Sequence, residues 1–166
     1  MYLLDTGIVA ALRKAKWDAD LTPLAQWARR VPNPNLFISA LSLLELENGV
    51  AQAAKRDPEA AKPLRDWLDA QVARAFDGRI LSLDAAIVRR RAQLSYEDGR
   101  DGLMAATALE HGLTLVTRRP SAYRSGRVKL LNPFDAETQD SLLDKEQWPG
   151  DARAGASWLR NLFLRF

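Results

Sequence analysis

The sequence predicts an α/β fold: a three-layer α/β/α domain with a mostly parallel central sheet of about five strands, plus a C-terminal helical extension. Short apolar segments alternate with longer segments whose apolar residues recur at helical spacing. This alternation is typical of strands joined by helical crossovers, which form parallel sheets covered on both faces. The 166 residues suffice for one domain with a substantial core. We expect that domain at residues 1–134 and the extension at 135–166.

The predicted strands are short, rich in β-forming residues and bounded by turn-forming residues. They are residues 2–5, 36–41, 79–83, 113–117 and 128–132. The turn signals include Asn33-Pro34-Asn35 before the second strand and Asp77-Gly78 before the third. In open parallel sheets the functional crevice lies beyond the carboxyl ends of the strands. Polar residues that directly follow a strand are therefore the first candidates for a site.

The predicted helices lie between these strands. Residues 22–31 place Leu24, Trp27, Ala28 and Val31 on one face. After the second strand, Ser42 and Glu45 have capping-box spacing and predict a helix start, and Asp57-Pro58 predicts its end. A further helix carries apolar residues between 64 and 76, and a polar helix follows the third strand. A small-residue helix, LMAATALEH (103–111), ends at Gly112, with His111 as a helix-end residue rather than a general base.

Composition limits the classes of function. The chain has 47% hydrophobic and 27% charged residues and no cysteine, which excludes disulfides, thiolate metal sites and a cysteine nucleophile. No apolar run approaches the roughly 20 residues of a membrane span, and no basic segment precedes the first apolar run. We therefore expect a cytoplasmic protein without a signal peptide or membrane partner. The net charge of +3 is compatible with a polyanionic partner. Positive charge concentrates in the second half, as solvated surface or as a binding face, at Arg89, Arg90, Arg91, Arg118, Arg119, Arg124, Arg127 and Lys129.

The tripeptide Asp5-Thr6-Gly7 follows the first predicted strand and has two interpretations. D-T-G is the tripeptide of aspartic proteases, which are built from β-sheet and need a second D-T-G or a homodimer. This chain has no second copy and too much predicted helix. The remaining interpretation is an aspartate at the end of a strand, which could serve as a metal ligand.

Three acidic residues could meet at the carboxyl ends of the strands: Asp5, Glu45 and Asp101. Gathered carboxylates repel one another unless a cation compensates, and Mg²⁺ or Mn²⁺ prefers oxygen ligands. Each residue also has a structural explanation. Asp5 terminates a strand, Glu45 completes a capping box, and Asp101 suits the helix dipole, with Asp98 as the alternative cap. Thr6 and Thr117 could bind a metal-bound water, a phosphate or the backbone.

Four sequence blocks, in order, give the chain a family resemblance. They are YLLDTGIV, FISALSLLELENGV, DGLMAATALEHGLTLVTRRPSAY and VKLLNPF, spanning roughly residues 2–134. The chain resembles the PIN-domain family, in particular the VapC-type toxins of toxin–antitoxin pairs. The resemblance implies a Mg²⁺- or Mn²⁺-dependent endoribonuclease with Asp5, Glu45 and Asp101 as catalytic metal ligands. It further implies an RNA substrate held by Thr6, Thr117, Arg118 and Arg119, a homodimer, and inhibition by a VapB-type antitoxin.

The chain departs from the family pattern at three positions. The family commonly has asparagine where this chain has Gly7, and T-R-N-x-x-D-F where it has Thr117 to Tyr123. Arg119 therefore replaces an asparagine and Ala122 replaces a fourth acid, changes that should weaken metal binding. Three further acids are possible substitutes, although two of them suit helix caps: Asp84, Glu97 and Asp98.

These departures support an alternative, a catalytically impaired PIN-fold module that binds RNA or protein. A phosphatase resembling haloacid dehalogenases is a third hypothesis, but it requires an aspartate at the position of Gly7. Beyond residue 135 the chain is polar and then ends in SWLRNLFLRF. Trp158, Leu162 and Phe166 recur every four residues and predict an amphipathic helix. It could pack on its own domain or dimer mate, bind a protein partner, or lie on a membrane surface.

Overall fold

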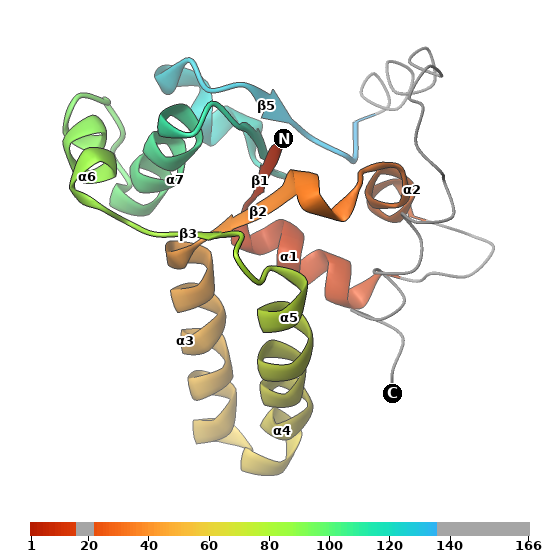
Figure 1. Cartoon of the computed structure of the whole chain (residues 1–166). Coiled ribbons are helices and arrows are strands. Elements are labelled where there is room, and N and C mark those ends of the chain that lie inside the picture. The colour runs from red at the N-terminus through yellow and green to blue at the C-terminus, as the bar shows by residue number, and fades with distance from the viewer. Residues whose placement is uncertain (16–21, 136–166) are drawn as a thin grey trace.

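A five-stranded parallel sheet forms the centre of the computed structural model, which describes residues 1–15 and 22–135. The strand order is β3-β2-β1-β4-β5, and every neighbouring pair is parallel (Figure 1). The strands are β1 (Tyr2–Leu4), β2 (Leu36–Ser39), β3 (Ile80–Leu81), β4 (Thr114–Val116) and β5 (Leu130–Leu131). The predicted fold class is confirmed, although each strand is shorter than its predicted segment.

Helices cover both faces of this sheet (Figure 1). The α-helices are α1 (Thr6–Lys14), α2 (Pro23–Arg30), α3 (Ala40–Arg56), α4 (Pro58–Asp66), α5 (Ala73–Ala75), α6 (Ala85–Ala92) and α7 (Gly99–Glu110). A π-helical stretch, η2 (Trp67–Val72), joins α4 to α5. Two 3₁₀ segments, η1 (Asn33–Asn35) and η3 (Pro120–Gly126), precede β2 and β5.

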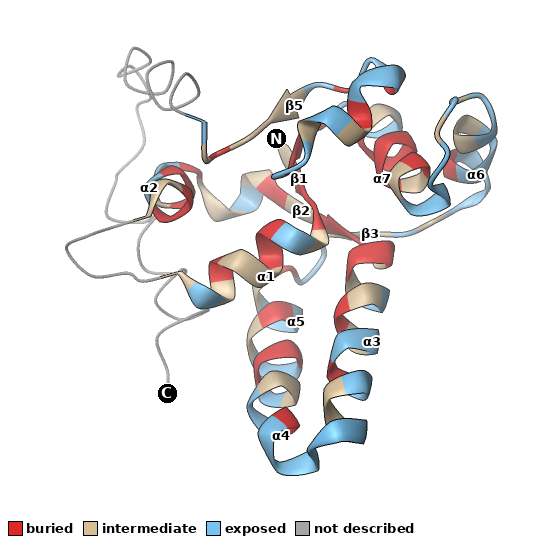
Figure 2. Cartoon of the chain, turned by 180° about the vertical axis from the view of Figure 1, so that it is seen from behind, coloured by how far each residue is buried: buried red, intermediate tan, exposed pale blue. Residues whose placement is uncertain are grey.

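The central strand β1 separates two apolar clusters because successive side chains of a strand point to opposite faces. Leu4 packs into the cluster with residues of α1, α2, α3 and η2. Leu3 packs into the cluster on the other face, with residues of α7 and Tyr123 of η3. Both leucines are completely buried, and each such side chain stabilises the fold by about 1.5–3 kcal/mol. Figure 2 shows the buried residues along the strands and on the inner faces of the helices.

Helices α3 and α4 form a hairpin that projects from the sheet (Figure 1). Asp57 lies between them, and its carboxylate accepts hydrogen bonds from the backbone N–H groups of Glu59 and Ala60. The predicted break at Asp57-Pro58 is therefore confirmed. The helix predicted across 64–76 continues from α4 through η2 to α5, with Pro63 inside α4.

The predicted start of the helix after β2 is corrected, and one further helix was not predicted. Helix α3 begins at Ala40 because Ser39 has extended backbone angles and its hydroxyl accepts a hydrogen bond from Leu41 N. The predicted capping box of Ser42 and Glu45 does not form, and Glu45 lies in the second turn of α3. Helix α1 was not predicted; it follows β1 directly, with Asp5 as its N-cap.

The described part of the chain contains no helix with the length and apolar character that a membrane span requires. The amphipathic helix predicted at residues 158–166 lies outside the described residues. The boundary between the domain at 1–134 and the extension at 135–166 therefore stays a prediction.

Candidate active site

A pocket of about 230 Å³ opens beyond the carboxyl ends of β1 and β4, at the place predicted for parallel sheets. It is lined by Asp5, Thr6, Gly7, Leu41, Glu45, Arg100, Asp101, Met104, Arg118, Arg119 and Tyr123. The three predicted acidic residues thus reach one pocket from the end of β1, from α3 and from α7. Three arginines and a tyrosine also line the pocket, and two of these arginines, Arg100 and Arg119, pair with the acids.

Asp5 is the most buried of the three acidic residues, with 9% of its surface exposed. As N-cap of α1, its Oδ1 accepts a hydrogen bond of 2.7 Å from Ile8 N. Burial raises the pKa of the Asp5 carboxyl, and the nearby charge of Glu45 adds to this effect. Hydrogen bonds from Thr117 and Ile8 and the charge of Arg119 only partly oppose it. The Asp5 carboxylate therefore lies in a poorly hydrated position that a cation would stabilise.

Glu45 points from the second turn of α3 toward the N-terminus of α1. The Thr6 hydroxyl donates a hydrogen bond to its Oε2, and Arg100 Nη1 lies 3.4 Å from its Oε1. The side chain of Glu45 is 27% exposed and that of Arg100 is 71% exposed. The ion pair with Arg100 is therefore open to solvent and weak.

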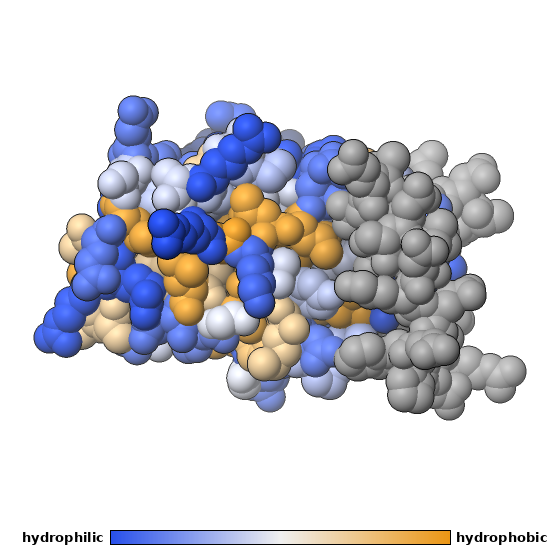
Figure 3. Space-filling model, turned by 90° about the horizontal axis from the view of Figure 1, so that it is seen from above, coloured by the Kyte–Doolittle hydropathy of each residue, from blue (hydrophilic) through white to orange (hydrophobic). Residues whose placement is uncertain are grey.

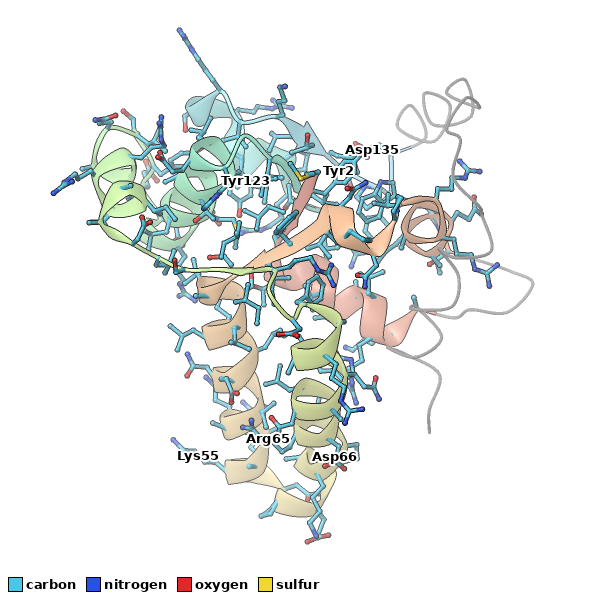
Figure 4. All side chains as sticks on the ribbon, in the orientation of Figure 1. Tyr2, Lys55, Arg65, Asp66, Tyr123 and Asp135 are labelled. Atoms are coloured by element: carbon cyan, nitrogen blue, oxygen red, sulfur yellow. The ribbon has the colours of Figure 1, made fainter. Side chains whose placement is uncertain are left out.

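Asp101 lies in the first turn of α7, whose N-cap is Asp98. Its Oδ1 accepts two hydrogen bonds, from Arg119 Nη2 at 2.9 Å and from the Tyr123 hydroxyl at 3.0 Å. Burial, followed by the charge of Asp101, raises the pKa of the Tyr123 phenol, which therefore keeps its proton. The negative charge of Asp101 raises the pKa of Arg119. Tyr123 is labelled in Figure 4 beside α7.

The four residues predicted to bind phosphate have different environments. Thr6 donates to Glu45, and the fully buried Thr117 accepts a hydrogen bond of 3.1 Å from Arg119 N. Arg118 lies over the ring of Phe134, 4.1 Å from its centroid. Thr6, Arg118 and Arg119 line the pocket, and Arg119 also bonds to Asp101. Thr117 is not among the lining residues, and its side chain forms a hydrogen bond with Asp5. Their role in RNA binding stays a prediction.

Two polar residues of the pocket, Arg100 and Tyr123, were not predicted from the sequence. Arg100 directly precedes Asp101 in the chain, and Tyr123 directly follows the position of the fourth acid. Tyr123 is held in place through η3, because the Tyr96 hydroxyl donates a hydrogen bond of 2.9 Å to its carbonyl oxygen. A Cβ on Gly126 would lie only 2.2 Å from that hydroxyl, so this close approach requires glycine.

The positions that depart from the family pattern, Gly7, Arg119 and Ala122, have different surroundings in the structure. A Cβ on Gly7 would lie 3.3 Å from Asp5 Oδ1, so a side chain there would press on that carboxylate. Ala122 packs against the apolar cluster around Tyr123 and does not line the pocket. Asp84 and Asp98 cap α6 and α7, which confirms their capping roles. The charge that most directly alters the acidic site is therefore that of Arg119.

The chemistry of the pocket suits a hard divalent cation, because its donors are carboxylate and hydroxyl oxygens. Within residues 1–15 and 22–135, however, the structure gathers no group of three or more His, Cys, Asp or Glu side chains as a ready metal site. The carboxylates share the pocket, but Asp101 bonds to Arg119 and Glu45 to Arg100. The donor atoms are of the kind that such an ion binds, and the charges of Arg100 and Arg119 beside Glu45 and Asp101 oppose its binding.

The basic residues of the second half divide into structural and exposed groups. Arg90 pairs with Glu110, and Arg91 donates to the carbonyl oxygens of Leu94 and Tyr96. The others, Arg89, Arg124, Arg127 and Lys129, are exposed. Figure 3, seen from above relative to Figure 1, shows hydrophilic side chains lying around and across a few hydrophobic ones. His111 is an exposed residue at the end of α7, as predicted.

The fold and the pocket define a class: a parallel α/β domain with an acidic pocket at the carboxyl ends of its central strands. Residues 2–120 match the model of the PIN domain, and the chain belongs to the PIN-domain family. It is 31% identical over 145 residues to "VapC ribonuclease Y4jK" of Sinorhizobium fredii, covering 81% of this chain and 99% of that protein. "Toxin FitB" of Neisseria gonorrhoeae is 28% identical over 142 residues, with coverage of 81% and 99%.

Solved structures support the same assignment. The crystal structure of FitAcB from Neisseria gonorrhoeae aligns with a TM-score of 0.70 and 26% identity. The alignment covers 81% of this chain and 99% of that chain. The family resemblance seen in the sequence blocks is thereby confirmed.

Proposed function

We propose that this chain is a Mg²⁺- or Mn²⁺-dependent endoribonuclease and the toxin of a toxin–antitoxin pair. The observation that carries the proposal is the convergence of Asp5, Glu45 and Asp101 on one pocket in a PIN-domain chain. The names ribonuclease and toxin, borne by relatives that align along nearly their whole length, support the same function.

In this proposal the three carboxylates hold the divalent ion. A bound Mg²⁺ or Mn²⁺ supplies an activated water and offsets the charge that develops on the phosphodiester. Thr117 and Ile8 fix the orientation of the Asp5 carboxylate through hydrogen bonds. Tyr123 does the same for Asp101. Arg118 lies at the pocket with its guanidinium supported by Phe134, where it can bind a backbone phosphate of RNA.

The same proposal includes two protein partners: a VapB-type antitoxin that inhibits the chain, and a second copy in a homodimer. Support for the antitoxin comes from the likeness to proteins named as toxins. Co-expression with an antitoxin and size determination of the purified complex would test both partners.

RNA cleavage by the purified, antitoxin-free chain tests the activity. Wild type should cleave with Mn²⁺ and stop when EDTA removes the ion. The variants Asp5→Asn, Glu45→Gln and Asp101→Asn should each lose at least about 100-fold in rate, because each removes one charged ligand. Asp98→Asn is the matched control: it removes a carboxylate from the same helix outside the pocket and keeps the cap. Cleavage that survives all three substitutions would contradict the proposed site.

One observation favours a second candidate, a PIN-fold module that binds RNA without cleaving it. Arg119 already neutralises Asp101, and the position of the fourth acid holds Ala122. If this candidate is right, folded wild type binds RNA equally well with Mn²⁺ and with EDTA and produces no fragments.

A further inference from the structure

Arg119 gives the acidic pocket a cation of its own. Its Nη2 lies 2.9 Å from Asp101 Oδ1. The side chain of Asp101 is 14% exposed, whereas that of Arg119 is 65% exposed. The carboxylate is therefore fixed in the wall of the pocket, and the guanidinium reaches it from solvent.

The backbone and the side chain of Arg119 differ in how firmly they are held. The backbone N–H donates a hydrogen bond of 3.1 Å to the buried hydroxyl of Thr117. The long side chain has several rotatable bonds and can leave Asp101 without any change in that backbone contact. Its neighbour Arg118 lines the same pocket but lies over Phe134, and it pairs with no acid within residues 1–15 and 22–135.

A divalent cation and Arg119 compete for Asp101. Oδ1 already accepts two hydrogen bonds, from Arg119 and Tyr123, which occupy the lone pairs of that oxygen. An approaching cation also meets the positive charge of the guanidinium next to the carboxylate. The other oxygen, Oδ2, can also coordinate a cation, but that cation would still lie close to the guanidinium. Asp101 therefore binds the cation more strongly once Arg119 has moved away.

Once displaced, Arg119 is an unpaired guanidinium at the mouth of a pocket proposed to receive RNA. A phosphate is its natural new partner, because the planar fork of arginine matches two phosphate oxygens. We propose, resting on the function proposed above, that Arg119 is an exchangeable counter-ion that passes from Asp101 to an RNA phosphate when the divalent ion binds. Arg119 is thus a positioning residue that makes metal and RNA bind cooperatively.

The exchange has measurable consequences. An ion pair this exposed is weak, so its removal should tighten metal binding in the absence of RNA by about fivefold. Coupling between two ligands is reciprocal, so RNA should tighten metal binding to wild type by a similar factor. Without Arg119 most of that coupling should disappear.

The experiment measures the dissociation constant of Mn²⁺ by electron paramagnetic resonance of the free ion. It uses wild type, Arg119→Asn and Arg118→Asn, each alone and saturated with a 2′-O-methyl RNA that cannot be cleaved. The proposal expects Arg119→Asn to bind Mn²⁺ about fivefold more tightly than wild type without RNA and to gain little more when RNA is added. Arg118→Asn removes the same charge from the same pocket without breaking an ion pair, so its affinity for Mn²⁺ alone should change less than twofold. Arg119→Lys, which keeps the charge, should resemble wild type.

Equal Mn²⁺ affinity and equal coupling in wild type and Arg119→Asn, with both proteins folded, would overturn the exchange and leave the proposed ribonuclease intact. A gain in Arg118→Asn as large as that in Arg119→Asn would also overturn it, because the effect would then be that of net charge. Failure of every variant to bind Mn²⁺ with or without RNA would remove both the exchange and the proposed metal site.

Discussion

The buried negative charge of Asp5 should lower the free energy of unfolding at neutral pH, and replacement of Asp5 by asparagine should remove this effect. Asp5 is buried, with 9% of the residue exposed, and burial raises the pKa of its carboxyl group above the ordinary value of 3.8. Asparagine keeps an oxygen that can accept the bond from Ile8 N, and it carries no charge to desolvate. Asp5→Asn should therefore be at least as stable as wild type at pH 7 in EDTA.

Asp5→Ala separates the charge from the cap. Both variants lack the buried charge, but alanine also lacks the capping oxygen, so Asp5→Ala should be about 1 kcal/mol less stable than Asp5→Asn. For a chain of this size that difference lowers the melting temperature by about 2–4 °C. Urea unfolding monitored by circular dichroism, with melting curves as a check, measures both quantities.

The pH dependence of the same comparison has a definite sign. Because the folded-state pKa of Asp5 is raised, the folded state favours the protonated acid. The free energy of unfolding of wild type should therefore be closest to that of Asp5→Asn below about pH 3.8, the pKa of Asp5 in the unfolded state. It should fall relative to Asp5→Asn as the pH rises through the folded-state pKa. If Asp5→Asn were about 1 kcal/mol less stable than wild type at pH 7 and no more stable than Asp5→Ala, this reasoning would be refuted. The charge of Asp5 would then itself stabilise the fold.

Three further predictions concern packing and RNA. In Gly102→Ala the new Cβ would lie 2.1 Å from Arg91 Nε, so the free energy of unfolding should fall by about 1 kcal/mol. In Gly49→Ala the new Cβ meets open space in α3, so the free energy of unfolding should rise by up to about 1 kcal/mol. The urea midpoints of the two variants should therefore shift in opposite directions, and shifts in the same direction would contradict this account. Arg79→Ala should lower the free energy of unfolding in urea by about 2 kcal/mol because it removes the hydrogen bonds from Arg79 to three backbone carbonyl groups, and an unchanged midpoint would contradict that role. RNA affinity should fall with salt, and Arg118→Asn should reduce the slope of log K against log salt by about 1; an unchanged slope would place Arg118 away from phosphate.

The sheet could be predicted from the sequence because each strand is a short apolar run between turn signals. Asp57-Pro58 and Asp98 could be predicted for a similar reason, since capping depends on a few neighbouring residues. The start of α3 could not, because Ser39 and Ser42 are both plausible caps. The extended backbone at Ser39, which pairs with Leu81 of β3, decides between them.

The pocket was predictable in position and acidic composition, since parallel strands bring their carboxyl ends to one edge. Its electrostatics were not, because they depend on side-chain directions that no spacing in the sequence specifies. The sequence places Arg119 eighteen residues after Asp101, and only the fold of η3 beside α7 brings the two together. Tyr123 reaches Asp101 for the same reason.

Isothermal titration of Mn²⁺ into folded wild type and into Asp5→Asn, both saturated with RNA that cannot be cleaved, tests the central claim most directly. We predict binding to wild type and at least about a tenfold weaker affinity in Asp5→Asn, because the most buried carboxylate of the pocket is lost. Equal binding by the two proteins, or no binding by wild type, would contradict a divalent-metal ribonuclease site built on Asp5, Glu45 and Asp101.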